Sequence, residues 1–323
     1  MASLLSVENL QVQFQTKKGI NTAVDGVSFS VEKGRILGIV GESGCGKSVT
    51  SMSILQLLGS NARISGGSIK LDGKELIGLP EKEMCRIRGN DIAMIFQDPM
   101  TALNPTLTIG TQLMEPIMLH QNCGKKEAWT RAVDVLKRVG IAAPEKRMKE
   151  YPHQLSGGMR QRVMIAMAVS CEPRLLIADE PTTALDVTIQ AQILGLMCEL
   201  REKMGTAIML ITHDMGVVAE TADDVLVLYA GKAVEYGSIE DIFERPKHPY
   251  TQGLLNSIPR LDEDVELLNT IEGTVPAPDA MPAGCRFAPR CPYGKDRCMN
   301  EKPGVYHAGN ALVSCFRYEG EKE

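Results

Sequence analysis

The chain has 323 residues, of which 35 are basic and 40 acidic, so its net charge is −5. This length is enough for one large or two modest domains, and the hydrophobic fraction of 44% and charged fraction of 23% are ordinary for a soluble globular protein. The lack of a basic excess argues against nucleic acid as the main partner. No apolar run approaches the roughly 20 residues of a membrane helix, and the N-terminus lacks the pattern of a signal peptide. We therefore expect a cytoplasmic chain that meets any membrane through protein partners.

Strands and helices are predicted in a consistent order along the chain. The strands are expected at residues 4–14, 22–31, 35–40, 68–71, 92–97, 174–179, 207–212, 225–229 and 233–236, and the helices at 47–58, at 188–204 and from 215. Residues 108–171 are mostly helical in pattern, and 238–258 fit two short helices split by residues 245–249. Because buried strands alternate with helices, we expect an α/β fold with a largely parallel sheet and a helical insertion over about 98–172.

The segment Gly41-Glu42-Ser43-Gly44-Cys45-Gly46-Lys47-Ser48 fits the phosphate-loop pattern G-x-x-x-x-G-K-[ST], with Val49 following it. An apolar strand precedes this loop and a helix-compatible run follows it, which is the context that the motif requires. Glycines let backbone N–H groups converge on phosphate oxygens, and the start of a helix adds partial positive charge. We expect Lys47 to reach the β- and γ-phosphates and the Ser48 hydroxyl to ligate Mg²⁺.

A second motif is the apolar run of residues 175–178, which ends in Asp179 and Glu180. At the end of a buried strand, Asp179 can hold Mg²⁺, and Glu180 points elsewhere and can orient or deprotonate the attacking water. Alone, this pattern also fits a buried strand that meets a solvated acidic turn. The phosphate loop some 130 residues earlier favours the catalytic interpretation.

A third motif lies about 20 residues before Asp179, where Ser156, Gly157 and Gly158 open a helix. Successive N–H groups at such a helix start make a further anion site, to which Ser156 adds a hydroxyl. The alternative is a plain helix cap, with Ser156 as the capping residue and the glycines in the turn. The order of the three motifs favours the anion site.

With these motifs the chain resembles the ATP-binding subunits of ABC transporters. Residues 41–48 resemble the Walker A motif, residues 175–180 the Walker B motif and residues 155–162 the LSGGQ signature, in which Met159 replaces the commoner Gln. The resemblance implies an α/β P-loop NTPase core over residues 1–237, with an antiparallel β subdomain and an inserted helical subdomain. It also implies ATP and Mg²⁺ as ligands, held between the Walker motifs of one subunit and the signature of a second subunit that faces it head to tail.

The same resemblance suggests roles for four further residues. Gln97 resembles the Q-loop glutamine that touches Mg²⁺ and senses the γ-phosphate, and Asp186, in Ala184-Leu185-Asp186, resembles the D-loop aspartate. His213 resembles the switch histidine, although a helix-capping histidine is the alternative. Phe14 fits the aromatic residue that stacks on adenine, and its alternative is a core phenylalanine of a strand. Together with Glu180, Gln97 and His213 complete the expected catalytic set.

Residues 96–105 and the tail motif His248-Pro249-Tyr250-Thr251-Gln252 are similar to the oligopeptide/dipeptide (and nickel) importer subfamily, and the chain resembles its D-type subunits. This implies a peptide importer at the cytoplasmic face of the membrane. The implied partners are a second, related ATPase subunit, two transmembrane permease subunits and an extracytoplasmic binding protein. Import of nickel or another small solute, and a soluble ABC-type ATPase unconnected with transport, are the alternatives.

Four of the nine cysteines, Cys285, Cys291, Cys298 and Cys315, lie in the proline-rich last part of the chain, within the expected extension 238–323. The spacing differs from zinc-finger spacing, but four thiolates can hold a [4Fe–4S] cluster or zinc. The resemblance favours iron and sulfur; zinc and no metal are the alternatives, as is a tail that senses redox state. Four basic residues of this region would partly offset a negative cluster or would be solvated at the surface: Arg286, Arg290, Lys295 and Arg297.

Overall fold

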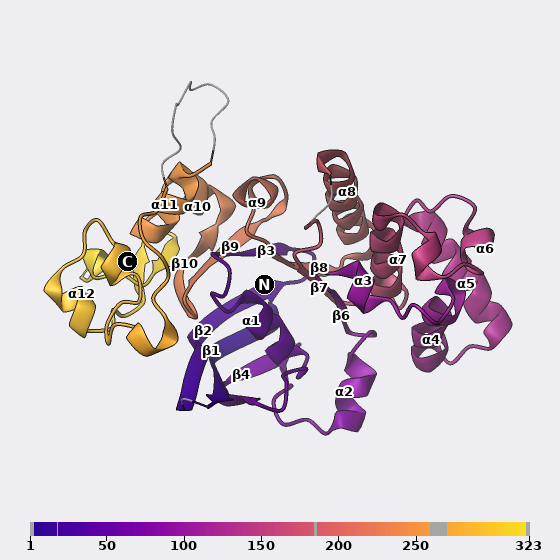
Figure 1. Ribbon diagram of the computed structural model, residues 1–323, viewed down its shortest axis with the longest axis horizontal. Coiled ribbons are helices and arrows are strands. Elements are labelled where there is room, and N and C mark those ends of the chain that lie inside the picture. Colours follow the sequence, from indigo (N-terminus) through magenta and orange to yellow (C-terminus); the bar gives the residue numbers. More distant parts are fainter. Residues whose placement is uncertain (1–2, 18, 184–185, 259–269, 321–323) are drawn as a thin grey trace. The chain divides into compact units, whose positions relative to one another are not determined.

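The computed structural model, drawn in Figure 1, describes residues 3–17, 19–183, 186–258 and 270–320. The chain divides into two compact units. Unit 1 comprises Met1–Val31, Ile36–Ile77 and Thr212–Glu323, and unit 2 comprises Glu32–Arg35 and Gly78–Ile211. Among the helices within these described ranges, none has the length and apolar character needed to cross a membrane.

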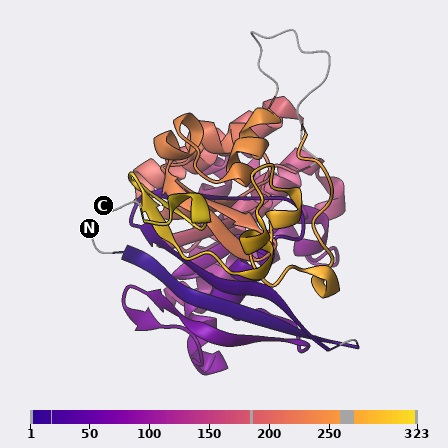
Figure 2. The ribbon, with the colours of Figure 1, turned by 90° about the vertical axis from the view of Figure 1, so that its left-hand side faces the viewer.

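An antiparallel sheet forms the first part of unit 1. Its strands are β1 (Ser3–Thr16), β2 (Gly19–Glu32), β4 (Ala62–Leu71) and β5 (Lys74–Glu75), in the order β2-β1-β4-β5. Figure 2 shows the long strands β1 and β2 running side by side. Leu5 pairs with Leu71 and Val7 with Ile69, so buried apolar side chains gather on one face. The first two predicted strands are confirmed, whereas β4 begins earlier than the expected residue 68.

A second set of strands in unit 1 includes β3 (Ile36–Val40), which leads into the phosphate-loop segment. In sheet order the strands are β11 (Tyr306–Ala308), β12 (Ala311–Val313), β10 (Lys232–Ser238), β9 (Asp224–Tyr229) and β3. The helices of this part are α1 (Lys47–Ile54), α9 (Met215–Thr221), α10 (Ile239–Glu244) and α11 (Pro249–Asn256). All of β3 is buried, and it pairs in parallel with β9. The predicted helix 47–58 is wrong at its end, because Gln56 adopts a left-handed backbone with φ 51°.

The C-terminal extension has more regular structure than its proline content indicates. It contains α12 (Asp296–Asn300) and the hairpin β11–β12, and β12 pairs with β10 so that Val313 lies opposite Glu235. Short 3₁₀ turns occur in the extension at Pro278–Ala280, Ala288–Arg290 and Phe316–Tyr318, and a further one, Pro152–Gln154, lies in unit 2. Figure 2 shows the extension, in orange to yellow, as mostly loops between short elements. The expected boundary between residues 237 and 238 stays a prediction.

Unit 2 consists of a parallel set of strands and a group of helices. Its strands are β8 (Ala207–Ile211), β7 (Leu175–Asp179) and β6 (Ile92–Ile95), with β7 in the middle. Its helices are α2 (Glu81–Ile87), α3 (Pro99–Ala102), α4 (Ile109–Gln121), α5 (Lys125–Arg138), α6 (Pro144–Arg147), α7 (Gly157–Val169) and α8 (Val187–Met204). Helices α4 to α7 lie together in Figure 1. Because the strands are parallel, the residues that follow β6 and β7 meet at one edge.

Candidate functional site

In unit 1, the segment between β3 and α1 forms a loop whose backbone requires glycine. Gly41, Gly44 and Gly46 have φ values of 150°, 78° and 100°. At Gly41 a Cβ atom would lie 2.1 Å from the carbonyl oxygen of Leu228, whereas at Gly44 the same atom would meet nothing within 4 Å. Gly41 therefore allows the loop to pack closely on β9, whereas Gly44 is needed only for a sharp turn of the backbone.

Lys47 lies at the start of α1, and its side chain is folded back over the loop. It is 6% exposed, and its ammonium donates to the carbonyl oxygens of Gly41 at 2.6 Å and Glu42 at 3.2 Å. Ser48, the next residue, is exposed. A cation, glycine-rich backbone and a helix N-terminus thus occur together, and this combination suits a phosphate chain. The buried Cys45 thiol beside Lys47 has a raised pKa because burial outweighs the effect of the ammonium.

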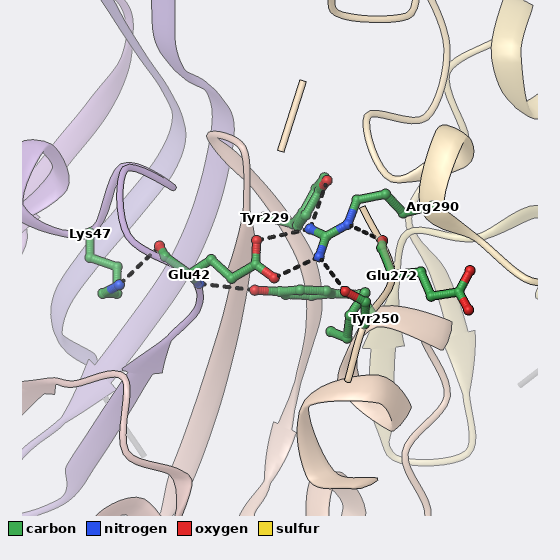
Figure 3. Close-up of polar contacts among 7 residues, drawn as sticks. Glu42, Lys47, Tyr229, Tyr250, Glu272 and Arg290 are labelled. Atoms are coloured by element: carbon green, nitrogen blue, oxygen red, sulfur yellow. Dashed lines mark hydrogen bonds and ion pairs between the residues drawn. The ribbon is translucent and has the colours of Figure 1, made fainter. Parts of the chain in front are cut away.

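The loop is also held by residues of the C-terminal extension (Figure 3). The guanidinium of Arg290 donates to both carboxylate oxygens of Glu42, at 2.9 and 3.1 Å, and the hydroxyl of Tyr250 accepts from the Glu42 N–H at 2.9 Å. Sequence reasoning missed both contacts, although it had singled out the motif that contains Tyr250. The expectation that Arg290 and Arg286 are solvated is wrong, because their side chains are only 6% and 15% exposed and pair with Glu42 and Asp25; the expected offset of a cluster stays a prediction.

In unit 2, Gln97 and Glu180 meet where their strands end. The register pairs Ile95 with Ala178, so the two residues follow neighbouring parallel strands at the same level. The Gln97 amide donates to the Glu180 carboxylate at 2.8 Å, and the Thr183 hydroxyl donates to the same oxygen at 3.0 Å. Glu180 has a positive φ of 47°, a strained conformation for a residue with a side chain. Strain of this kind is concentrated at functional sites, and here it occurs at the residue that carries the carboxylate at this edge.

Asp179, the last residue of β7, is 5% exposed. The next residues are tied to α7, because the buried side chain of Gln161 donates to the Pro181 carbonyl. Helix α7 begins after Ser156, whose hydroxyl accepts from the Met159 N–H at 3.4 Å, so the capping interpretation of Ser156 holds. Capping does not exclude anion binding, because Ser156 and Gly157 are exposed and a Cβ at Gly157 would meet nothing within 4 Å.

The remaining expected residues lie at the ends of elements. Asp186 caps α8 by accepting from the Ile189 N–H at 3.0 Å, while Ala184 and Leu185 of the expected D-loop lie outside the described residues. His213 is exposed and precedes Asp214, which caps α9. Phe14, near the end of β1, is half-buried and lines a cavity of about 220 Å³. Gly158 faces α8, because a Cβ atom added at this glycine would lie 3.4 Å from the Ile189 side chain.

The four cysteines of the extension line one small cavity of about 80 Å³, together with His248. Burial raises the pKa of Cys285 to about 11 and also raises the pKa of Cys291 and Cys315, and the neighbouring thiols add to each shift. Within the part of the chain that the structure describes, no three His, Cys, Asp or Glu side chains converge closely enough to hold a metal ion. The thiols therefore share a cavity without forming a ligand set.

Comparison with known proteins agrees with this geometry. The family model "ABC transporter" matches residues 24–183, and the model "Oligopeptide/dipeptide transporter, C-terminal region" matches residues 234–298. The chain is 56% identical to the oligopeptide transport ATP-binding protein AppD of Bacillus subtilis over 99% of this chain and 98% of that protein. It is 53% identical to the dipeptide transport ATP-binding protein DppD of the same species, over 100% and 97%.

Among solved structures, the chain resembles a dimeric ATP-binding cassette in a post-hydrolysis state bound to ADP and Pi. The TM-score is 0.66 at 27% identity, over 73% of this chain and 98% of that chain. The fold and its motifs are those of an ATP-hydrolysing ABC cassette. More narrowly, the chain belongs to the ATP-binding proteins of the oligopeptide and dipeptide ABC transporter family.

Proposed function

We propose that this chain powers the import of dipeptides or oligopeptides by binding and hydrolysing ATP at the cytoplasmic face of a membrane. It would act with a second, related ATPase subunit, two transmembrane permease subunits and an extracytoplasmic binding protein. The observation that carries the proposal is the Walker A geometry, in which Lys47 donates to the loop carbonyls beside the start of α1. The peptide cargo is supported by the match of the C-terminal extension and by the names of the relatives.

Each residue type in the proposed site suits one part of the chemistry. Lys47 would bind the β- and γ-phosphates, and Phe14 would stack on adenine. The oxygen atoms of Ser48, Asp179 and Gln97 fit Mg²⁺, a hard cation that supplies neutralising charge to phosphate oxygens when bound. Glu180 would take a proton from water as its oxygen attacks the γ-phosphorus, while the bond to the leaving ADP oxygen breaks and ADP keeps the electron pair. We infer that His213 positions the γ-phosphate.

The proposed partner ATPase would complete the site through the signature segment. Ser156 and Gly157 are exposed. Gly158 faces Ile189 of α8, and Val187, two residues before Ile189 at the start of this helix, is 83% exposed. Asp186, which caps α8, adjoins this surface. A surface that closes over a bound triphosphate needs N–H groups that bind anions, as at Ser156 and Gly157, and an apolar side chain to pack against the facing subunit, as at Val187. These N–H groups would therefore serve the nucleotide of the facing subunit.

Uptake into proteoliposomes that contain the complete transporter tests this proposal. With ATP inside and the binding protein outside, we expect accumulation of a labelled dipeptide or tripeptide, which Lys47→Ala abolishes. Accumulation of Ni²⁺ without accumulation of peptide would overturn the peptide assignment and leave the ATPase assignment intact.

We propose further that Cys285, Cys291, Cys298 and Cys315 hold a [4Fe–4S] cluster, with zinc as the alternative metal. The support is that all four thiols line one cavity. Binding would require them to lose their protons and to move closer together, because thiolates are the ligands. Given the loop-rich surroundings, the expected role is structural.

Metal analysis of anaerobically purified protein tests this second proposal. We expect iron and sulfide, or zinc, in the wild type, and loss of the metal in Cys298→Ser together with protease sensitivity of residues 270–318. Nucleotide binding should persist, and Cys85→Ser, at an exposed cysteine outside the cavity, is the matched control. A wild type without iron or zinc would overturn the proposal.

A further inference from the structure

The segment from Cys285 to Cys291, here called the clamp segment, packs against the part of unit 1 that carries the phosphate loop. Phe287 is 2% exposed and lies edge-on to Tyr229, with ring centroids 5.1 Å apart. It also packs on Tyr250, with the centroids 5.4 Å apart. These aromatic contacts are buried, so they set where the rest of the clamp segment lies.

Arg290, near the end of the clamp segment, uses its whole guanidinium. Besides its two bonds to Glu42, it donates to the carbonyl oxygens of Glu272 at 3.0 Å and Ile271 at 3.2 Å, and it lies 3.4 Å from the Tyr229 hydroxyl (Figure 3). The fork geometry of these bonds needs an arginine, because a lysine ammonium cannot bind both carboxylate oxygens and the carbonyls in one plane. At 6% exposure, the Arg290 side chain is nearly buried, and each of its guanidinium nitrogens has a hydrogen-bond partner.

Glu42, the partner of Arg290, is the second residue of the phosphate loop and is held on three sides. Arg290 binds its carboxylate, Tyr250 binds its backbone N–H, and its carbonyl oxygen accepts from the Lys47 ammonium at 3.2 Å and from the Cys45 N–H at 3.2 Å. Arg290 and the Lys47 ammonium are thus connected through a single residue, Glu42.

Arg286, at the start of the clamp segment, supplies a second connection. It donates to the Ala230 carbonyl and pairs with Asp25 at 3.1 Å. Gly231, which follows Ala230, donates its N–H to the Cys45 carbonyl at 2.9 Å, and its own carbonyl accepts from the Asp25 N–H at 2.9 Å. Arg290 therefore contacts the loop directly, and Arg286 contacts Ala230 and Asp25, whose neighbourhood is hydrogen-bonded to the loop through Gly231.

We propose that Arg290 is a positioning residue for the phosphate loop, acting through the carboxylate of Glu42, so that the C-terminal extension sets the affinity of the cassette for nucleotide. The inference rests on the proposed role of residues 41–48 in binding the triphosphate. Because the contact supports the loop whether the substrate is in its ground state or its transition state, its loss raises KM and leaves kcat nearly unchanged.

Mg²⁺–ATP binding to the full-length chain, measured by calorimetry, tests the proposal with Arg290→Gln and Glu42→Gln. We expect each variant to raise Kd by about tenfold, within the roughly 5- to 150-fold range typical of coupling between sites. The double variant should be no weaker than the weaker single variant, because both changes break the same contact. Arg290→Lys should be as weak as Arg290→Gln, since a lysine cannot form the fork.

Arg245→Gln is the matched control, because Arg245 is 62% exposed and forms a simple ion pair with Asp241 on α10. We expect it to bind like the wild type. Hydrolysis by the assembled transporter should show a raised KM and a kcat within about twofold of the wild type for Arg290→Gln, as loss of uniform binding requires.

Two results would overturn the proposal. One is a folded Arg290→Gln variant with the wild-type Kd, and the other is an Arg290→Gln effect that persists in full in the Glu42→Gln background. Should Arg290→Gln not fold, Glu42→Gln decides alone, and a wild-type Kd then refutes the role of the pair. Lys47→Ala distinguishes a failure of the proposed phosphate loop from a failure of the role of Arg290. If Lys47→Ala also binds nucleotide normally, the assignment of the phosphate loop fails. If Lys47→Ala is the one variant that weakens binding, the role of Arg290 fails and the phosphate loop stands.

Discussion

The phosphate loop of unit 1 and the carboxylate edge of unit 2 are held in different ways. At the loop, a nearly buried arginine from some 250 residues away binds Glu42 through two hydrogen bonds. At the edge, Glu180 accepts from Gln97 and Thr183 in contacts that are open to solvent, on a strained backbone. The loop is thus fixed in advance, whereas the carboxylate can exchange its partners for water.

Magnitudes support this contrast. Arg290 is 6% exposed and Glu42 28% exposed, so losing one partner of this pair costs more than losing a solvent-exposed hydrogen bond, which contributes about 0.5–1.5 kcal/mol net. A loop that binds phosphate has to be positioned before the nucleotide arrives, and the contacts of Arg290 with Glu42 help to position it. Glu180, the general base that we propose, would have to release its resting partner when the reacting water arrives, and a weak, exposed contact allows this release.

Glu180→Gln should give the largest effect and tests the edge alone. Since the amide cannot take a proton, hydrolysis by the assembled transporter should fall about 10²- to 10⁴-fold, the usual contribution of a positioned base. Nucleotide binding should persist and trap an ATP-bound closed dimer, visible by size-exclusion chromatography. Normal turnover in this variant would refute the assignment of the base.

Gly41→Ala and Gly44→Ala form a pair that tests the rigidity of the loop. Both place a side chain at positive φ, but only the first drives Cβ into the Leu228 carbonyl, at 2.1 Å. Nucleotide affinity should fall about 10- to 100-fold in Gly41→Ala, as expected for roughly 1–3 kcal/mol of backbone strain. Gly44→Ala should lose about 1 kcal/mol of stability and retain more of its affinity. Equal losses of affinity, measured by calorimetry, would argue against close packing on β9.

Gln97→Ala removes the exposed partner of Glu180 and should have a smaller effect. Because one solvent-exposed hydrogen bond and one proposed Mg²⁺ ligand are lost, we expect hydrolysis to fall by roughly tenfold, equivalent to about 1.4 kcal/mol. The dependence on Mg²⁺ concentration should shift upward in the same assay. An unchanged Mg²⁺ dependence would show that Gln97 only orients Glu180.

His248→Asn should give the smallest effect, seen in how stability depends on pH. Burial, helped by Arg317, lowers the pKa of His248 to about 3, so below its unfolded pKa near 6.5 the unfolded chain binds a proton that the folded chain excludes. The stability that the neutral His248 contributes is therefore nearly complete at about pH 7.5 and declines as the pH falls through 6.5 toward 3. The loss between pH 7.5 and 6 should be about 1 kcal/mol.

Asparagine is the appropriate replacement, because it can still accept the Tyr250 N–H at the start of α11 as His248 Nδ1 does. Glu235 binds the His248 N–H and has a pKa raised by burial, so it acts in the opposite direction. The difference between wild type and variant in denaturant titrations at several pH values isolates the histidine. An identical pH dependence in both would contradict its buried, neutral state.

The sequence predicts those features that rest on local pattern. The alternation around Leu5 and Val7 predicts β1, and the loop motif predicts the charge arrangement around Lys47, because both depend on neighbours in sequence. The register of β6 on β7 explains why Gln97 meets Glu180, although the contact itself was not predicted.

Long-range pairs and very short elements were not predictable. Nothing near Arg290 in the sequence indicates Glu42, because the pair forms only when the extension packs against the loop within unit 1. The hairpin β11–β12 has strands of three residues each, too short for a periodic pattern. The helix end at Ile54 depends on the backbone of Gln56, and glutamine is otherwise a good helix former.

Calorimetric titration of the full-length chain with ATP in magnesium buffer tests the central claim most directly. We expect the wild type and Glu180→Gln to bind with similar affinity, and Lys47→Ala to bind at least about tenfold more weakly, since a charge-assisted hydrogen bond contributes about 1.5–3 kcal/mol. Absence of nucleotide binding by the wild type, alone and in the assembled transporter, or unchanged binding by Lys47→Ala, would contradict the account.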